Sequence, residues 1–400
     1  MTSIDIEASL SDEEHAARDT CHKFAEEILR PAGRDLDRLP DPAQVIARGS
    51  VLWDVFEKYQ ETGIGRFFAD KSMEPVAKAR LMCIINEELS WGDVGLAITL
   101  GLCQFHQPWI EQIGHQELLE RFCSPDRLTI GCWALTEPDH GSDTVAFTEP
   151  FFSSPALRAN CVARQVGDEY VISGQKAAWV SNGTIADIAV LFCTLDPSQG
   201  LKGGAVFLVP LDLPGIYRPK PLDKLGQRSL NQGEIYFNDV RVPASHMVLG
   251  PEFYSMALEA MLAHANAAMG QLFVGVARAA LEYAIDYAKQ RVQGGVPIFE
   301  HQSVKGRLFK MFMKVEAARA LARRVALYNA ANPPLVQYSI ATKVFCTNTA
   351  FEVASDAVQI FGGNGLSREY PIEKILRDAR ASMIEDGCNE VLSLLGASRL

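Results

Sequence analysis

The chain has 400 residues, 48% of them hydrophobic and 22% charged, a composition that supports two or three packed units and excludes a disordered chain. A formal charge of -11 at pH 7 leaves no basic stripe, so we expect no nucleic acid among its partners. The nine cysteines are scattered without a CxxC pair, which argues against a disulfide framework and against a zinc site.

The first residues, MTSIDIE, are acidic and contain no cationic segment followed by an apolar run. We therefore expect neither export nor organelle import, and a cytoplasmic protein. No apolar run reaches the roughly 18 residues that a membrane span needs, so we also expect no membrane span.

The first third of the chain has the apolar spacing of helices. From residue 12 to about residue 121, apolar side chains recur every three or four positions, as at Ala79, Met82, Ile85 and Leu89. This pattern predicts a helical N-terminal domain over residues 1–127.

The sequence pattern then changes to short runs of β-branched and aromatic residues between turn residues, which is typical of an antiparallel sandwich or barrel. We predict a middle β domain over residues 128–243. Its expected strands include residues 170–172, 188–192, 205–209 and 234–237.

Helical spacing returns after Pro251 and continues to the end of the chain. Long helices are predicted at 258–291, 304–329 and 338–361, with proline residues in the gaps between or after them. The sequence therefore predicts a helical bundle over residues 244–400.

Two polar motifs mark the β region. In TEPDHGSD, the hydroxyls of Thr136 and Ser142 and the small Gly141 suit a phosphate-bearing ligand, although the motif alone is also a plain turn. In GQKAAWVSNG, Trp179 and Ser181 share one face of a strand and could cover a flat heterocycle and bind its edge. Alone, a strand tryptophan is more often a core residue.

The helical bundle has polar candidates of its own. Arg291 and Gln302 lie near the ends of predicted helices, where they suit phosphate and base edges, and a solvated charge or helix cap is the alternative. The glycine-rich run QIFGGNGL begins at Gln359, and Asp386 follows on a glycine turn with Gly387. No HExxH, GxSxG or GxxxxGK motif occurs.

Taken together, these segments resemble the acyl-CoA dehydrogenase family in order and spacing across nearly all 400 residues. The resemblance implies an α+β multidomain fold: a helical N-terminal domain, a middle antiparallel β-barrel and a C-terminal four-helix bundle (244–400), with FAD between barrel and bundle. The residues that would bind FAD are Trp133, Leu135, Thr136, Ser142, Trp179, Ser181, Arg291, Gln302, Gln359 and Gly363. Some of them would reach the FAD of a neighbouring subunit, which implies a homodimer or homotetramer.

The same resemblance implies a reaction. Asp386 would remove the proton α to the carbonyl of an acyl-CoA thioester while the β-hydride moves to flavin N5, giving a 2,3-enoyl-CoA. Ser142, Asn266 and Gly387 would contact the substrate. Electrons would pass to an electron-transfer flavoprotein or another acceptor.

The chain also departs from the common family pattern. Asp386 stands where the family usually has glutamate, and a displacement on the order of 1 Å can cost about 100-fold in rate. The alternative family position for a base is Ala265, the neighbouring Asn266 replaces the usual arginine, and Glu259 lies on another helix face. A proline-glycine loop is missing near residues 67–71, and one alanine is inserted before Trp179.

Three alternatives to acyl-CoA dehydrogenation stay open. The first is a dehydrogenase of thioesters on an acyl-carrier protein. The second is an oxidase related to nitroalkane oxidase, which also uses aspartate, although Ser393 stands where that enzyme has an arginine. The third is a lyase or acyl-CoA-binding protein without redox chemistry.

Overall fold

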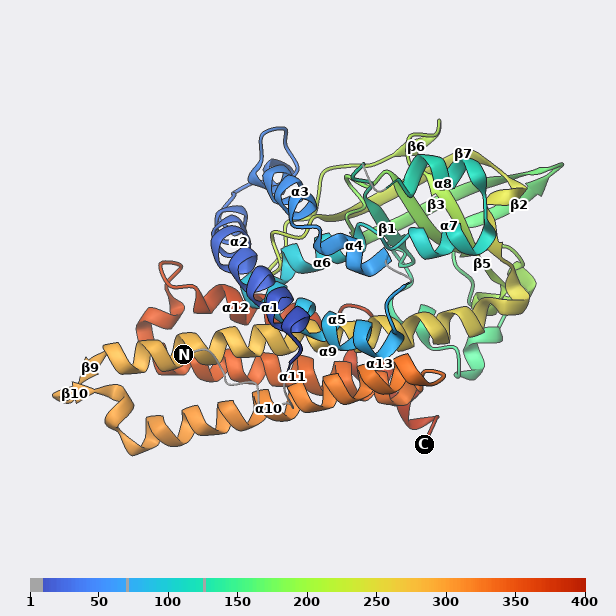
Figure 1. Ribbon diagram of the computed structural model, residues 1–400. Coiled ribbons are helices and arrows are strands. Elements are labelled where there is room, and N and C mark those ends of the chain that lie inside the picture. Colours follow the sequence, from blue (N-terminus) through green and yellow to red (C-terminus); the bar gives the residue numbers. More distant parts are fainter. Residues whose placement is uncertain (1–9, 70–71, 125–126) are drawn as a thin grey trace.

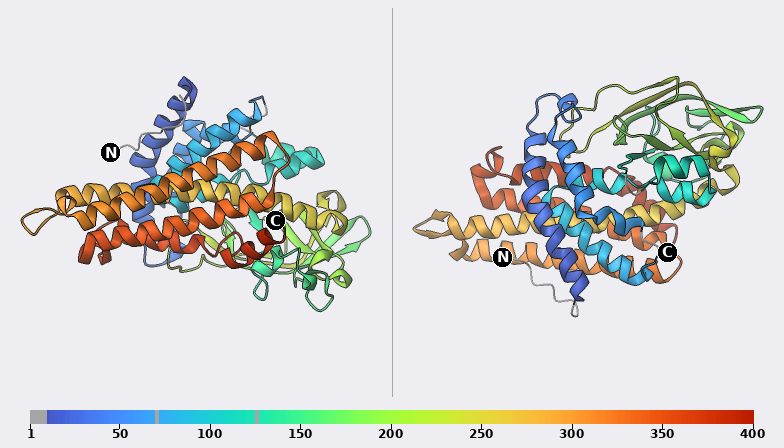
Figure 2. Two further views of the ribbon diagram at one scale, coloured as in Figure 1. Left: turned by 90° about the horizontal axis from the view of Figure 1, so that it is seen from below. Right: turned by 45° about the horizontal axis from the view of Figure 1, so that its top comes forward.

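The computed structural model describes residues 10–69, 72–124 and 127–400, and the departure expected at residues 67–71 lies partly outside these ranges. Helices occupy both ends of the chain and a sheet occupies the middle (Figure 1). This order is the predicted fold class. The long helices lie side by side, and helices of the N-terminal region pack across them (Figure 2).

The N-terminal region consists of helices, several of which start at polar caps. Ser11 caps α1 with a capping box, and the Asp93 carboxylate accepts the N–H of Leu96 at the start of α6. The α-helices of this region are α1 (Asp12–Phe24), α2 (Arg30–Asp37), α3 (Val51–Thr62), α4 (Ile64–Ala69), α5 (Pro75–Gly92), α6 (Val94–Leu102), α7 (Gln107–Ile113) and α8 (Gln116–Phe122).

The middle region forms one eight-stranded sheet with the path β6-β7-β3-β2-β4-β5-β8 and with β1 beside β4. Most pairings are antiparallel, as predicted, but β1 runs parallel to β4, and β2 meets β4 in parallel at Val162 and Thr194. The strands are β1 (Gly131–Ala134), β2 (Val162–Val166), β3 (Glu169–Ser181), β4 (Ile188–Thr194), β5 (Gly204–Pro210), β6 (Ile216–Tyr217), β7 (Gln232–Pro243) and β8 (Met247–Leu249).

Strands β4 and β5 are buried on both faces, which explains their continuous apolar sequences. One face, with Leu191 and Phe207, joins the main core that also contains residues of the N-terminal helices. The other face, with Val190 and Leu208, packs with residues of α7, α8 and the first turns of α9, including Leu258. The sheet is therefore held between helical layers.

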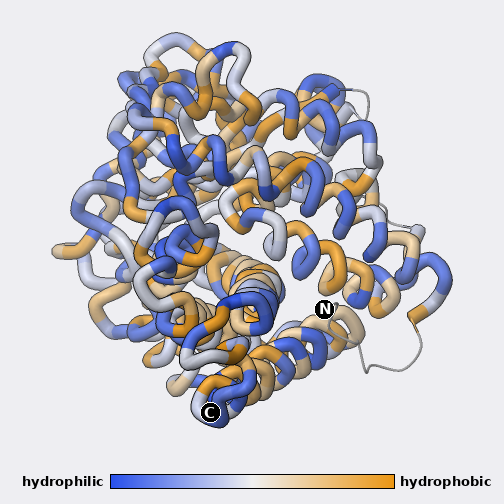
Figure 3. Tube along the Cα trace, turned by 90° about the vertical axis from the view of Figure 1, so that its left-hand side faces the viewer, coloured by the Kyte–Doolittle hydropathy of each residue, from blue (hydrophilic) through white to orange (hydrophobic). Residues whose placement is uncertain are grey.

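The C-terminal region is built on α9 (Pro251–Gln290), α10 (Gln302–Ala331) and α11 (Val336–Phe361), close to the predicted ranges. The shorter α12 (Ile372–Ser382) and α13 (Asn389–Ala397) pack on α11. A hairpin of β9 (Val292–Gln293) and β10 (Val296–Pro297) joins α9 to α10 at the end of the bundle far from the sheet (Figure 1). Hydrophilic and hydrophobic positions alternate along these helices (Figure 3).

Within the described residues, α9 is the one helix long and apolar enough to cross a membrane by length and composition. Its 18-residue window has a mean hydropathy of 1.2, and 78% of that window is buried in the fold. Polar residues interrupt this window, so it is not the continuous apolar run that was sought in the sequence. Burial of this kind is typical of a core helix in a bundle.

Candidate functional site

The predicted base lies in the turn between α12 and α13, which we call the base turn (residues 383–388). Asp386 and Gly387 both have left-handed backbone conformations, with φ values of 52° and 89°. Glycine adopts such a conformation without steric cost and aspartate tolerates it better than most residues, which explains the Asp-Gly sequence. Glu385 lies in the same turn and not in a helix.

Hydrogen bonds on two sides hold the base turn to its surroundings. The N–H of Cys388 donates to Ser142 Oγ (2.9 Å), which joins the turn to the first polar motif of the β region. On the other side, Lys343 Nζ in α11 donates to the carbonyl of Gly387 (2.8 Å). The N–H of Asn389 donates back to the carbonyl of Met383 (3.0 Å). The turn is therefore fixed between sheet and bundle.

Glu385 connects the base turn with the β region through a hydrogen bond. Gln227 Nε2 donates to the Glu385 carboxylate (2.6 Å). Nearby, Lys224 Nζ donates to Gln232 Oε1 (2.7 Å), and Gln232 Nε2 donates to Ser181 Oγ (3.0 Å). Polar side chains thus connect Ser181, a predicted FAD-binding residue, with the neighbourhood of Glu385 and Asp386.

A buried ionic chain anchors the same loop of the β region to both helical regions. Lys374 Nζ lies 2.6 Å from carboxylate oxygens of both Asp93 and Asp378. The backbone N–H of Gln227 donates to the other oxygen of Asp378, and Ser229 Oγ donates to Asp93 (2.6 Å). Because these residues come from three parts of the chain, the network fixes where Gln227 meets Glu385.

The two carboxylates of the base turn have perturbed acidity. Burial raises the pKa of Asp386, and the nearby charge of Lys343 opposes that rise. Burial, followed by the charge of Asp386, raises the pKa of Glu385 to about 7. Two lysines flank the pair, and burial lowers the pKa of Lys343 to about 8 and that of Lys224 to about 7. Raised carboxyl pKa values of this kind are typical of a general base.

The two polar motifs of the β region are locked to each other. Glu137 of the first and Lys176 of the second form a buried ion pair (2.7 Å). Lys176 also donates to the carbonyl of Leu135 (2.9 Å), and Thr136 Oγ1 donates to the carbonyl of Ala177 (3.2 Å). The ion pair and these hydrogen bonds hold the two motifs side by side.

The inserted alanine produces a bulge in β3. The pairing of β3 with β7 breaks between Lys176 and Val180, and Ala178 has a φ of 59°. Beyond the bulge Val180 is buried, while Trp179 is 58% exposed and Ser181 is partly exposed. Trp179 is therefore not a core residue, and it shares an outward face with Ser181 as expected.

Two of the other predicted residues carry buried polar atoms without a partner among the described residues. The indole N–H of Trp133, on β1, has no acceptor. Asn266 is fully buried in α9, where Nδ2 donates to the carbonyl of Leu262 (3.0 Å) but Oδ1 has no donor. No hydrogen bond among the described residues joins Asn266 to the base turn. Leu135 is buried beside Lys176.

The remaining predicted cofactor residues lie at the other end of the bundle. Tyr287 near the end of α9 stacks on Phe361 at the end of α11, with ring centroids 4.0 Å apart. This contact brings together the ends of the two helices, near the β9–β10 hairpin (Figure 1). The residues at this end are Arg291, Gln302, Gln359 and Gly363, all exposed. One chain does not bring them to the base turn.

The other acidic and polar candidates do not join the base turn. Glu259 forms an ion pair with Arg399 (2.9 Å) near the surface. Ser393 Oγ donates to the carbonyl of Asn389 within α13 (2.7 Å). Asp386 is thus the candidate carboxylate that lies in the turn bonded to both sheet and bundle.

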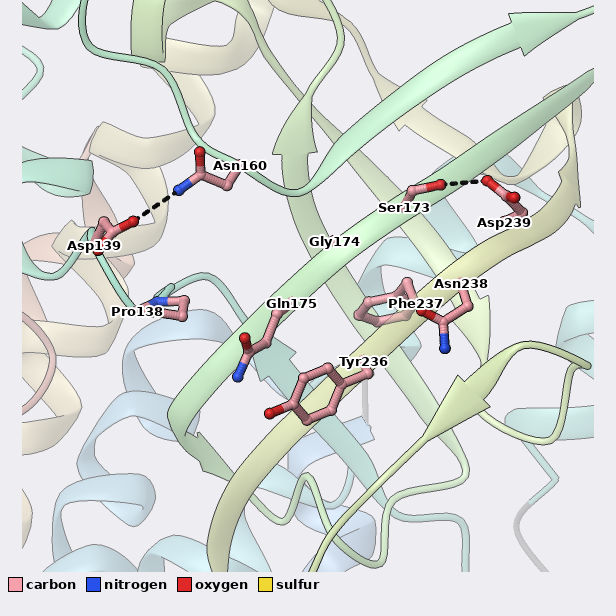
Figure 4. A pocket seen from close by; sticks show the side chains of 10 residues that line it. All are labelled: Pro138, Asp139, Asn160, Ser173, Gly174, Gln175, Tyr236, Phe237, Asn238 and Asp239. Atoms are coloured by element: carbon pink, nitrogen blue, oxygen red, sulfur yellow. Dashed lines mark hydrogen bonds between the residues drawn. The ribbon is translucent and has the colours of Figure 1, made fainter.

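A hollow of about 500 Å³ opens beside the two motifs, on the face of β3 and β7 (Figure 4). Its side chains bond mainly to one another: Ser173 donates to Asp239 (2.7 Å), and Asn160 donates to Asp139 (3.4 Å). None of the predicted cofactor or substrate residues lines it. Its lining residues are Pro138, Asp139, Asn160, Ser173, Gly174, Gln175, Tyr236, Phe237, Asn238 and Asp239.

The site contains residues that sequence reasoning missed, above all Lys343 and Gln227. Lys343 was recognisable, because it falls on the apolar face of α11 with Ile340 and Ala350, where a charged side chain is unusual. Gln227 carries no such signal, since its role depends on a contact with Glu385 across 158 positions of the chain.

Comparisons with known proteins agree with this geometry. The family model described as "Acyl-CoA dehydrogenase, middle domain" matches residues 132–240, and "Acyl-CoA dehydrogenase, C-terminal domain" matches residues 255–400. The chain is 31% identical over 393 residues to the mitochondrial short-chain specific acyl-CoA dehydrogenase of Mus musculus, covering 96% of this chain and 89% of that protein.

Two further proteins extend the likeness. Benzylmalonyl-CoA dehydrogenase of Aromatoleum aromaticum is 30% identical over 405 residues, covering 99% of this chain and all of that protein. The structure of butyryl-CoA dehydrogenase from Megasphaera elsdenii superposes with a TM-score of 0.84 at 29% identity, covering 98% of this chain and 99% of that one. With fold, motifs and sequence in agreement over almost its whole length, the chain belongs to the acyl-CoA dehydrogenase family of FAD-dependent oxidoreductases.

Proposed function

We propose that this enzyme removes one hydrogen each from the α and β carbons of an acyl-CoA thioester, giving a 2,3-enoyl-CoA. The observation that carries the proposal is the base turn. It presents Asp386, a carboxylate with a raised pKa, between the sheet and the bundle, next to the polar motifs of the β region. A weakly acidic α-proton needs a base of this kind.

Residues on the sheet side of the base turn fit FAD. Trp179 offers an exposed aromatic face, the N–H of Trp133 lacks an acceptor, and a Cβ at Gly141 would meet no atom within 4 Å, so a ligand can approach the backbone there. Leu135, Thr136, Ser142 and Ser181 would complete this half of the site. FAD, when bound, supplies the acceptor for the β-hydride.

In the proposed reaction Asp386 takes the α-proton onto its carboxylate. The hydrogen bonds of the described residues leave the backbone N–H of Asp386 without a protein acceptor, so this group can donate to the thioester carbonyl. Such a hydrogen bond stabilises the negative charge that develops on the carbonyl oxygen as the proton leaves. Gly387, Ser142 and Asn266 are the proposed substrate contacts, with Asn266 offering its unpaired side-chain oxygen.

The division of the cofactor residues into two groups supports an oligomer. Arg291, Gln302, Gln359 and Gly363 lie at the far end of the bundle, so in the proposal they bind the adenylate end of the FAD held mainly by a neighbouring subunit. We therefore propose a homodimer or homotetramer, with an electron-transfer flavoprotein as the electron acceptor.

The test is an anaerobic titration of the FAD-loaded protein with short, long, branched and cyclic acyl-CoAs, following the visible flavin band. The expected result is bleaching by one class, with a product two mass units lighter than its substrate. The same titration with acyl-carrier thioesters and a separate aerobic assay with a nitroalkane complete the test. Bleaching by acyl-carrier thioesters alone, oxygen consumption with the nitroalkane, or an unbleached flavin with every thioester would each contradict the proposal.

A further inference from the structure

Lys343 is a buried lysine whose direct partners are all neutral. It lies in the middle of α11 with no measurable exposure. Its Nζ donates to the carbonyl of Gly387 (2.8 Å) and to Asn389 Oδ1 (2.8 Å). Among the described residues, no carboxylate forms a salt bridge with it.

Such an arrangement is unfavourable for stability by itself. An ammonium removed from water needs a nearby negative charge, and two other buried lysines of this protein have one in direct contact. Lys176 pairs with Glu137, and Lys374 pairs with Asp93 and Asp378. A neutral side chain at position 343 would pack in α11 without this cost. The positive charge of Lys343 therefore has another partner.

That partner is the base turn. The strongest favourable electrostatic interaction of Lys343 is with Asp386, followed by that with Glu385. Its hydrogen bond falls on the carbonyl of Gly387, directly after two successive left-handed residues. Gly387 adopts this conformation without cost, but for Asp386 it has a steric cost that the surroundings must offset. Ser142 holds the turn from the sheet side, and Lys343 holds it from the bundle side.

We propose that Lys343 is a positioning residue for Asp386: its ammonium fixes the base turn through the Gly387 carbonyl and keeps the Asp386 carboxylate ionised until it takes the substrate proton. The proposal rests on the proposed function, in which Asp386 is the base. Lys343 touches neither substrate nor proton.

The pH dependence follows from the charges around Asp386. Lys343 faces it from α11, Glu385 adjoins it in the base turn, and Lys224 lies beyond Glu385 on the β side. Flavin reduction rises with pH as Asp386 ionises, because only the carboxylate accepts a proton. Burial lowers the pKa of Lys343 to about 8, so the rate falls again as pH passes about 8 and Lys343 loses its charge.

The experiment measures the single-turnover rate of flavin bleaching against pH in the FAD-loaded wild type, Lys343→Met and Lys343→Arg. In Lys343→Met the rise moves to higher pH by about one unit, because a nearby cation no longer favours the ionised acid, and the fall near pH 8 disappears. In Lys343→Arg the rise stays in place and the fall moves above pH 8, because the guanidinium remains charged. Lys58→Met on the exposed face of α3 is the matched control and keeps the wild-type profile.

FAD content and thermal stability identify any variant that fails to fold. If Lys343→Met fails to fold, Lys343→Gln takes its place. Whatever the variants do, the bleaching rate of the wild type must fall near pH 8. A wild-type profile without that fall, or a Lys343→Met profile identical to the wild type, overturns the role of Lys343 while Asp386→Asn stays inactive. Full activity in Asp386→Asn overturns the base itself, and the proposal with it.

Discussion

Glu87 and Glu385 are both carboxylates enclosed by hydrogen bonds, but their pKa values move in opposite directions. Burial would raise the pKa of Glu87, yet Arg319 and then Arg278 lower it well below its ordinary value. Glu385 accepts from the neutral Gln227 and adjoins Asp386, and its pKa rises to about 7. A buried carboxylate with direct arginine partners therefore stays charged and holds helices together. A buried carboxylate with neutral partners can change its charge near pH 7.

The difference follows from where each cluster lies. Glu87 is in α5, where Arg278 of α9 (2.8 Å) and Arg319 of α10 (2.9 Å) reach it in the helical core. Glu385 is at the junction of sheet and bundle, where the base turn meets the polar motifs. The first cluster joins helices, and the second surrounds the proposed base.

The largest expected effect on stability comes from Glu87→Ala. The substitution removes the buried carboxylate that Arg278, Arg319 and Arg323 share, and it should lower the free energy of unfolding by about 3–5 kcal/mol. The control is Glu352→Ala, which breaks the exposed Lys314–Glu352 pair and should cost at most about 1 kcal/mol. Chemical denaturation of both variants checks this, and equal stability would contradict a structural role for the Glu87 cluster.

A smaller effect, confined to a range of pH, is expected from Glu385→Gln. Because the folded protein holds the Glu385 proton up to a pKa of about 7 while the ordinary value is 4.5, wild-type stability should fall relative to the variant as pH rises between these values. The difference should reach about 1–2 kcal/mol after allowance for partial exposure. Melting temperatures across this range measure it, and parallel curves for the two proteins would contradict the raised pKa.

The smallest effect is expected from Ser142→Ala, which removes the acceptor for the Cys388 N–H. Loss of one hydrogen bond, worth about 1 kcal/mol, should loosen the base turn and slow flavin bleaching by roughly fivefold to tenfold. Ser142→Thr keeps the hydroxyl and should recover most of the rate. FAD content is measured in both, because Ser142 is also a proposed cofactor contact. An unchanged rate in Ser142→Ala would show that this bond does not hold the base.

The sequence was sufficient for the order of elements because each has a local signal. The apolar spacing around Leu258 and Leu262 identifies a long helix, and Val190 and Leu208 lie in runs that are buried on both faces. The Asp386-Gly387 pair likewise indicates a turn by its composition. These features depend on neighbours within a few residues, so a single sequence is enough to predict them.

The surroundings of the base could not be predicted because they join distant segments. Lys343 and Gly387 are 44 positions apart, and Cys388 and Ser142 are 246 apart. The inserted alanine was visible in the sequence, but its outcome, a bulge at Ala178 that leaves Trp179 exposed, depends on the register with β7. The parallel pairing of β1 with β4 likewise joins segments that are far apart in the sequence.

The most direct measurement of the central claim is the anaerobic rate of flavin bleaching by the best acyl-CoA in wild type and in Asp386→Asn. Asparagine keeps the size of the side chain but cannot accept the α-proton. The account predicts a rate about 10²–10⁴-fold lower in the variant, with FAD content and melting temperature unchanged. Bleaching at the wild-type rate would show that another group takes the proton and would contradict the account.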